Sequence, residues 1–211
     1  MRRPERRQAI PTGRRRGFQR VRLGRSGSAA LEFALLAPLV VVLMVAVAET
    51  VTYLRGWHRL ERTAAEVANI ASQYQTLVPA DVATLFDAAS TIAAPWKAWA
   101  TTGPATGRAR TIIGVVNGTG AGNVLAWTCS RGDAGLAGRV AGVTTLPNSF
   151  RVPSGQTVLV VEVISAARPW SILSATGFGF FGTTGPDPIR TYAIVRPRQA
   201  QLNALGGACP A

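Results

Sequence analysis

One long apolar run dominates the sequence: AALEFALLAPLVVVLMVAVA, from Ala29 to Ala48, in which Glu32 is the only charged residue. As an α-helix, a run of this length spans about 30 Å, which matches the hydrocarbon thickness of a bilayer. The run therefore predicts a membrane-spanning helix. A single span near the start of the chain predicts that the rest forms a domain tethered to the membrane.

Positive charge is concentrated before this run. Residues 1–25 hold ten arginines and one glutamate, a net charge of +9, whereas the whole chain carries +13. A basic flank before a single span keeps the N-terminus in the cytoplasm, so we expect everything after Ala48 to be exported. Nucleic-acid binding is the other common use of an arginine-rich segment. Because Phe18 is the only aromatic residue among these arginines, we expect no nucleic-acid partner.

Two features leave open a different export route. Arg15-Arg16-Gly17-Phe18 resembles part of a twin-arginine signal, and Ala46-Val47-Ala48 is a small-residue site of the kind that signal peptidase cuts. Cleavage after Ala48 would release a secreted soluble binding domain. Against this alternative, ten residues separate Phe18 from the apolar run, and Glu32 is unusual in a disposable signal.

The residues around Glu32 form a distinctive sequence, GSAALEFALLAPL, directly after the basic leader. It resembles the start of a type IV prepilin, and more closely the TadE/TadG-like minor pseudopilins of the tight-adherence (Tad) pilus system. The resemblance implies that a prepilin peptidase recognises Gly27, Ser28, Glu32 and Phe33 and cuts after Gly27; an uncut anchor is the alternative. It also implies that Glu32 pairs with the amine of a neighbouring subunit, because opposite charges in a low dielectric offset part of their desolvation cost. Without that context, Glu32 would mark only the cytoplasmic edge of the span.

The helix is expected to continue past the span. Apolar residues recur at three- and four-residue steps beyond Ala48, and no proline intervenes there until Pro79. We therefore expect one helix over residues 29–75, with a bend at Pro38. Gly56 is expected to mark the point where this helix leaves the bilayer, with the neighbouring aromatic residues either at the interface or packed on the distal domain.

The distal part of the chain predicts an α+β fold. A second helix is expected at Asp81–Ala93, and a glycine-rich hairpin loop at Gly118–Gly122. Four strands with such connections indicate a small antiparallel sheet whose apolar face is covered by one or two helices. The expected strands are Arg110–Asn117, Asn123–Cys129, Thr157–Ser165 and Ile189–Arg196, and the segments 137–156 and 169–188 are expected to be irregular or partly helical.

Four segments follow from these observations. They are a basic cytoplasmic leader (1–27), a transmembrane segment (28–48), an amphipathic stalk helix (49–78) and an exported α+β head domain (79–211). The pieces AAEVANIASQY, LAWTC and YAIVRPR also resemble TadE/TadG-like sequences, more loosely than the N-terminal motif does.

The two cysteines, Cys129 and Cys209, are expected to form a disulfide in an exported domain. The alternative is a buried free thiol at Cys129. No nucleophile elbow, zinc-binding or phosphate-binding motif is present, and the sole histidine, His58, lies on the stalk beside Trp57. We therefore expect a protein without enzymatic activity, without cofactor or metal, and without a small-molecule substrate.

The resemblance also implies partners and a location. The partners would be the lipid bilayer, other Tad pilins and pseudopilins, the inner-membrane assembly platform and the prepilin peptidase. The protein would lie in the bacterial inner membrane as a single-pass protein, with a cytoplasmic N-terminus and a periplasmic head that can enter the pilus. Its expected function is pilus biogenesis and adhesion through helix packing.

Overall fold

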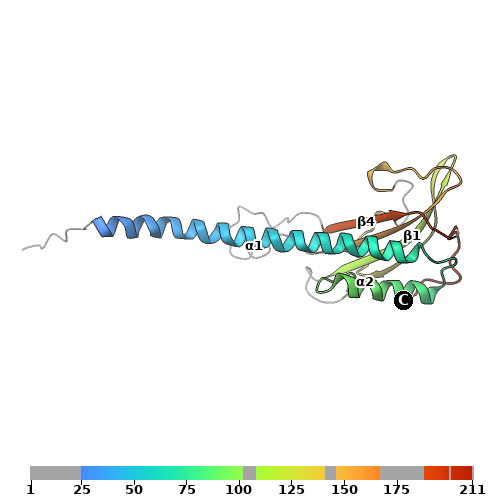
Figure 1. The fold of residues 1–211 in the computed structure, drawn as a ribbon, viewed down its shortest axis with the longest axis horizontal. Helices are drawn as coiled ribbons and strands as arrows, with labels where there is room; N and C mark the ends of the chain where they lie inside the picture. Colours follow the sequence, from blue (N-terminus) through green and yellow to red (C-terminus); the bar gives the residue numbers. More distant parts are fainter. Residues whose placement is uncertain (1–24, 102–107, 141–145, 167–187, 200, 211) are drawn as a thin grey trace, which may run out of the picture. The chain divides into compact units, whose positions relative to one another are not determined.

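The computed structural model describes residues 25–101, 108–140, 146–166, 188–199 and 201–210. Most of the leader and most of the segment 169–188 lie outside these residues. The fold is α+β, as the sequence predicts (Figure 1). The chain divides into two compact units, with the boundary between Val41 and Val42. Its elements are α1 (Arg25–Ala71), α2 (Pro79–Ala93), β1 (Ala109–Thr119), β2 (Gly122–Gly132), the short 3-10 helix η2 (Pro147–Ser149), β3 (Thr157–Ser165) and β4 (Ile189–Val195).

Helix α1 contains 47 residues and includes Pro38 without an interruption. It ends at Ala71, four residues before the predicted end, in a turn where the N–H of Gln73 donates to the carbonyl of Ile70 at 3.1 Å and the N–H of Tyr74 to that of Ala71 at 3.3 Å. The hydroxyl of Ser72 donates to the carbonyl of Asn69 at 2.7 Å, and the carbonyl of Ser72 accepts a hydrogen bond from the backbone N–H of Arg198 at 2.9 Å. A distant part of the chain thus replaces the next helical turn.

Helix α2 begins at Pro79, two residues before the predicted start. Proline suits the first helical position because the amide hydrogen that it lacks would have no intrahelical partner there. The carboxylate of Asp81 accepts a hydrogen bond from the N–H of Val78 at 3.1 Å, which satisfies a donor at the helix start. The helix ends at Ala93, two residues before Pro95, as predicted.

The four strands form one antiparallel sheet in the order β2-β1-β3-β4. Strands β1 and β2 pair as far as Thr119 and Gly122, so the turn is Gly120-Ala121 and the predicted five-residue loop is too long. Gly122 closes this turn with a φ of +132°, a conformation that favours glycine, and its carbonyl accepts the Thr119 hydroxyl at 2.7 Å.

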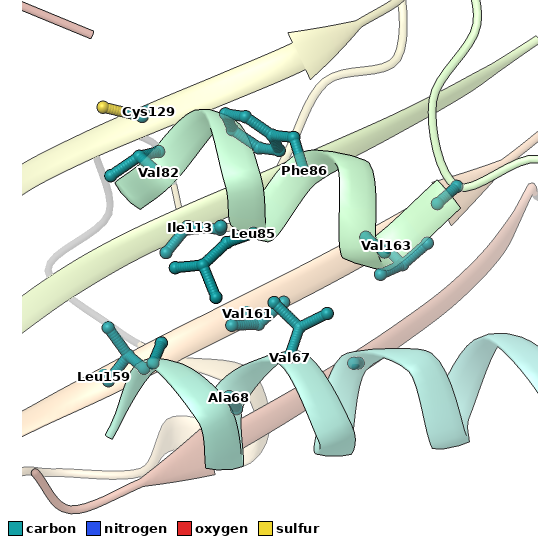
Figure 2. Packing of buried hydrophobic residues seen from close by; sticks show 14 of the residues in the cluster. Val67, Ala68, Val82, Leu85, Phe86, Ile113, Cys129, Leu159, Val161 and Val163 are labelled. Atoms are coloured by element: carbon teal, nitrogen blue, oxygen red, sulfur yellow. The ribbon is translucent and has the colours of Figure 1, made fainter. Parts of the chain in front are cut away.

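One face of the sheet packs on the two helices (Figure 2). Val67 and Ala68 of α1, together with Leu85 and Phe86 of α2, lie over the central strands, with Val161 of β3 among their neighbours. The buried stripe of α1 begins at the fully buried Leu60, and its other members are Ala64, Val67, Ala68 and Ala71. These positions recur at three- and four-residue steps, as an amphipathic helix requires.

The opposite face of the sheet is also buried. The sequence predicts a sheet with only one covered face, so the structure differs from the prediction here. Every residue of β3 is buried, so this strand has an apolar side chain facing either layer at almost every position. The second layer comes from the segment between β2 and β3. Its core contains Ile112, Val116, Val140, Leu146, Val152, Val158, Val160 and Ile164.

Candidate functional site on helix α1

The most exposed apolar surface of the described chain lies on α1. The helix is long and apolar enough to cross a membrane, and none of its most apolar 18-residue stretch is buried. Burying one large apolar side chain yields about 1.5–3 kcal/mol, so a helix with this many exposed ones favours an apolar environment. The exposed side chains are Leu31, Phe33, Leu35, Leu36, Leu39, Val40, Val41, Leu43, Met44 and Val47.

The predicted processing and pairing residues all lie on this helix. Gly27 and Ser28 lie in its first turn, and Glu32 and Phe33 follow about one turn later. Both of the latter side chains are exposed, Phe33 to 73%. The side chain of Glu32 therefore lies among exposed apolar side chains.

The helix changes character between Glu49 and Leu60. Glu49 is 8% exposed, Val51 and Leu54 are 40% and 49% exposed, and Leu60 is completely buried in the core of the second unit. Within this stretch the indole of Trp96 lies on Gly56, where a Cβ would come within 2.6 Å of Trp96 Cζ2. Gly56, which the sequence predicts to mark the exit from the bilayer, packs against Trp96 in the structure.

The same stretch forms one wall of an open groove of about 520 Å³ that the sequence interpretation missed. The groove is lined by Arg55, His58, Arg59, Arg62, Pro95 and Trp96. Its signal in the sequence is the spacing of the basic residues, which recur one helical turn apart and so share a face. The Pro95–Trp96 side of the groove gives no such signal, because it reaches α1 only through the tertiary fold.

The charges around the groove are partly compensated. Arg62 donates to the carboxylate of Glu66, and this hydrogen bond, together with the negative charge, raises the pKa of the Arg62 guanidinium. His58 Nδ1 lies 3.7 Å from Glu61 Oε2. Among the described residues, Arg55 and Arg59 form no ion pair, so the groove keeps two uncompensated positive charges.

The structure joins Cys129 of β2 to Cys209 as a disulfide, with their Cα atoms 5.4 Å apart. The C-terminal segment is also held by the indole of Trp127, which donates to the carbonyl of Leu202 at 2.7 Å. Leu202 is 2% exposed and belongs to the main core. The segment after β4 is therefore an integral part of the head.

A buried carboxylate lies on the other face of the sheet. Glu162 of β3 is 2% exposed, and its Oε2 accepts the backbone N–H groups of Arg139 at 2.8 Å and Val140 at 3.3 Å. Its Oε1 lies 3.6 Å from Arg190 Nη1, which also donates to the carbonyl of Ala137. Because the carboxylate holds the loop that follows β2, its role is structural.

The described residues contain no group of three or more His, Cys, Asp or Glu side chains that could hold a metal ion. Glu162 faces backbone amides and one arginine, and His58 lies on the surface beside Glu61. The described residues thus form a packing surface on α1 and a compact head.

Comparison with known proteins gives one match. The family of TadE-like proteins matches residues 27–69, which form most of α1. No curated protein and no solved structure matches the chain. The matched segment begins at the predicted processing glycine and continues into the buried stripe of the head. The resemblance seen in the sequence is thereby confirmed for residues 27–69, and the chain is TadE-like over this segment.

Proposed function

We propose that this protein is a non-enzymatic component of a Tad pilus assembly system, anchored in the inner membrane by α1. The main support for the proposal is that the TadE-like segment includes both the exposed apolar part of α1 and part of its buried stripe. The TadE-like match at residues 27–69 covers the stretch whose apolar side chains are exposed, and it ends within the part of α1 that is built into the head. One helix thus serves both as membrane anchor and as core element of the head.

The charge distribution supports an orientation for this anchor. The net charge of +9 in residues 1–25 favours a cytoplasmic N-terminus, and the head then lies in the periplasm. The disulfide between Cys129 and Cys209 fits such a compartment, because disulfides persist in the periplasm and are rare in the cytosol. In this arrangement residues 28–48 cross the membrane and residues 49–78 lead into the head.

Within the membrane, Glu32 would direct assembly. A carboxylate at membrane depth costs up to about 2.5–3.5 kcal/mol, and it is retained where it serves a function. We assign it the pairing with the N-terminal amine of a neighbouring pilin or pseudopilin, after a prepilin peptidase has recognised Gly27, Ser28 and Phe33 and cut after Gly27. The apolar surface of α1 would then pack among pilin helices or against the assembly platform, and the head would contribute to pilus biogenesis or adhesion.

N-terminal sequencing of the mature protein, purified from membranes of its own host, tests the proposal. A start at Ser28 is expected. A start at Glu49 would mean a secreted soluble domain and would overturn the membrane-anchored component. An intact Met1 would leave the anchor but overturn the processing step.

Deletion of the gene provides the functional readout. We expect surface pili to be lost or strongly reduced and to return when the wild-type chain is supplied. Alkaline carbonate extraction of membranes from the resupplied strain tests the anchor separately, since a spanning protein stays in the pellet. Wild-type piliation in the deletion strain would overturn the assignment to pilus assembly, whatever carbonate extraction of the resupplied strain shows about the anchor.

A further inference from the structure

The groove between α1 and the Pro95–Trp96 segment is open and lined by basic side chains. The proposed packing role gives these basic side chains no function. Its volume is about 520 Å³, and four basic side chains of α1 line it on one side. Arg55, Arg59 and Arg62 follow one another at four- and three-residue steps, which places them on one helix face. A folded surface therefore presents a row of cations beside an aromatic ring.

Trp96, which forms the aromatic wall of the groove, is held in place by its contacts. Trp96 lies on Gly56, so closely that a side chain at residue 56 would displace the ring. Trp96 is only partly exposed and is packed against the main core of the head. The width of the groove is thus set by the contact between the indole and the helix backbone.

Two of the cations are available to a ligand. Arg62 is engaged by Glu66, and His58 lies 3.7 Å from Glu61. In the part of the chain that the structure describes, Arg55 and Arg59 make no ion pair, and both side chains are exposed. A guanidinium presents a planar set of donors that fits two oxygens of a phosphate, so two of them on one face suit a phosphate group.

On the proposed anchor, the groove lies just beyond the span, near the lipid headgroups. Arg55 and Arg59 follow Ala48, the last residue of the predicted span, by seven and eleven positions, rises of about 10 Å and about 16 Å along a helix. Helical side chains point back toward the N-terminus, so the arginine side chains reach toward the span. The headgroup region extends roughly 5–8 Å beyond the hydrocarbon on each side. Val51, Leu54 and Trp57, all at least 40% exposed, continue the apolar surface up to this level.

We propose that this groove binds the phosphate of an anionic phospholipid in the leaflet adjoining the head. Arg55 and Arg59 donate to the phosphate oxygens, and Trp96 contacts the part of the lipid just below its phosphate. The inference rests on the proposed membrane anchor and goes beyond it, because it gives the head a fixed contact with lipid. It also gives a role to cations placed directly after a span on the exported side, where the topology rule disfavours them.

The test uses the full chain, purified in a neutral detergent with equal amounts of phosphatidylglycerol and phosphatidylcholine, and native mass spectrometry to count the lipids retained. Wild type is expected to retain phosphatidylglycerol in preference to phosphatidylcholine. Arg55→Gln with Arg59→Gln is expected to lower the retention of phosphatidylglycerol about tenfold, since each arginine near an anionic surface contributes a several-fold effect. Equal retention of both lipids by wild type would overturn the proposal.

Arg139→Gln with Arg151→Gln is the matched control, because it removes two exposed arginines and the same charge elsewhere on the head. This variant is expected to keep the preference of wild type; loss of the preference in it would indicate an effect of net charge and overturn the site. Circular dichroism checks that each variant is folded. Arg55→Lys with Arg59→Lys keeps the charge and is expected to bind more weakly than wild type, but better than the glutamine pair.

A separate arm distinguishes a lipid from free phosphate. Thermal unfolding of the same protein is measured with inorganic phosphate and with phosphatidylglycerol micelles. Stabilisation by phosphatidylglycerol alone supports the lipid, whereas equal stabilisation by inorganic phosphate assigns the groove to a soluble anion and overturns the proposal. Carbonate extraction reports separately on the anchor: release of the protein contradicts the proposed function, and an anchored protein without lipid preference contradicts only this inference.

Discussion

Trp96 lies against the backbone of Gly56 in the middle of α1, and a Cβ on residue 56 would come within 2.6 Å of Trp96 Cζ2. A glycine inside a helix costs roughly 1 kcal/mol relative to alanine. At this position the absence of a Cβ allows the large aromatic ring of Trp96 to contact the helix backbone. The contact joins the helix that carries the TadE-like segment to the segment that follows α2.

Replacing Gly56 by alanine is expected to lower the free energy of unfolding by about 1–3 kcal/mol, because the ring must move despite the better helix propensity of alanine. In a Trp96→Ala background the same substitution is expected to be neutral or stabilising by up to about 1 kcal/mol. Chemical denaturation of the four proteins in detergent gives the coupling between the two sites. A stabilising Gly56→Ala in the presence of Trp96 would contradict the contact.

Loss of the disulfide is expected to loosen the head. The bridge closes a sequence separation of 80 residues, and its removal in Cys129→Ser with Cys209→Ser is expected to cost about 2–4 kcal/mol. A reductant should lower the midpoint of thermal unfolding of wild type and leave that of the double variant unchanged. Equal sensitivity of the two proteins to the reductant would show that the bridge does not contribute.

The buried carboxylate on the second face of the sheet is expected to be sensitive to loss of its partner. Arg190→Gln leaves Glu162 buried with its two amide donors but without a cation, and we expect a loss of about 3–5 kcal/mol. Glu162→Gln keeps an acceptor for the amides and is expected to cost less, about 1–3 kcal/mol. Urea denaturation gives the order. An Arg190→Gln head as stable as wild type would indicate that the backbone donors alone satisfy the carboxylate.

Glu32 is expected to matter for assembly and not for insertion. Glu32→Ala removes a charge from the predicted span, so carbonate extraction should find at least as much protein in the membrane as for wild type. Pilus number, counted by electron microscopy, is expected to fall at least about tenfold, the scale of a single lost charge pair in low dielectric. Glu61→Ala removes an exposed carboxylate from the same helix beyond the predicted span, so it is the control and should leave piliation near normal. Unchanged piliation in Glu32→Ala would remove the pairing role.

The local elements could be predicted from the sequence because each has its own signals. The second helix lies between Pro79 and Pro95, and the sequence placed its end correctly. The strand Thr157–Ser165 was predicted with the observed bounds, since it is a continuous β-branched and apolar run. The first helix ends at Ala71 and not at Gln75, and the carbonyl of Ser72 directly after it accepts the N–H of Arg198, a contact that no local pattern indicates.

The candidate site shows the same difference between features with a local sequence signal and features that depend on tertiary contacts. Glu32 and its neighbours could be found because their signal is a contiguous motif on one helix. The basic groove was missed because Trp96 reaches Arg55 and Arg59 only through the tertiary fold. The partners of Glu162 were missed for the same reason, since Arg190 comes from β4 and the amide donors come from a loop before β3.

The segment that follows β4 closes the head by contacts with α1 and with the residues just after it. The Arg198 guanidinium donates to the side-chain carbonyl of Asn69 at 2.7 Å, and the N–H of Gly206 donates to the carbonyl of Leu77 at 3.1 Å. Leu202 completes the core beside residues translated more than a hundred positions earlier. The head therefore cannot close before the segment that follows β4 is available to it. A chain truncated before Arg198 lacks the residues that make these contacts and so cannot complete the head.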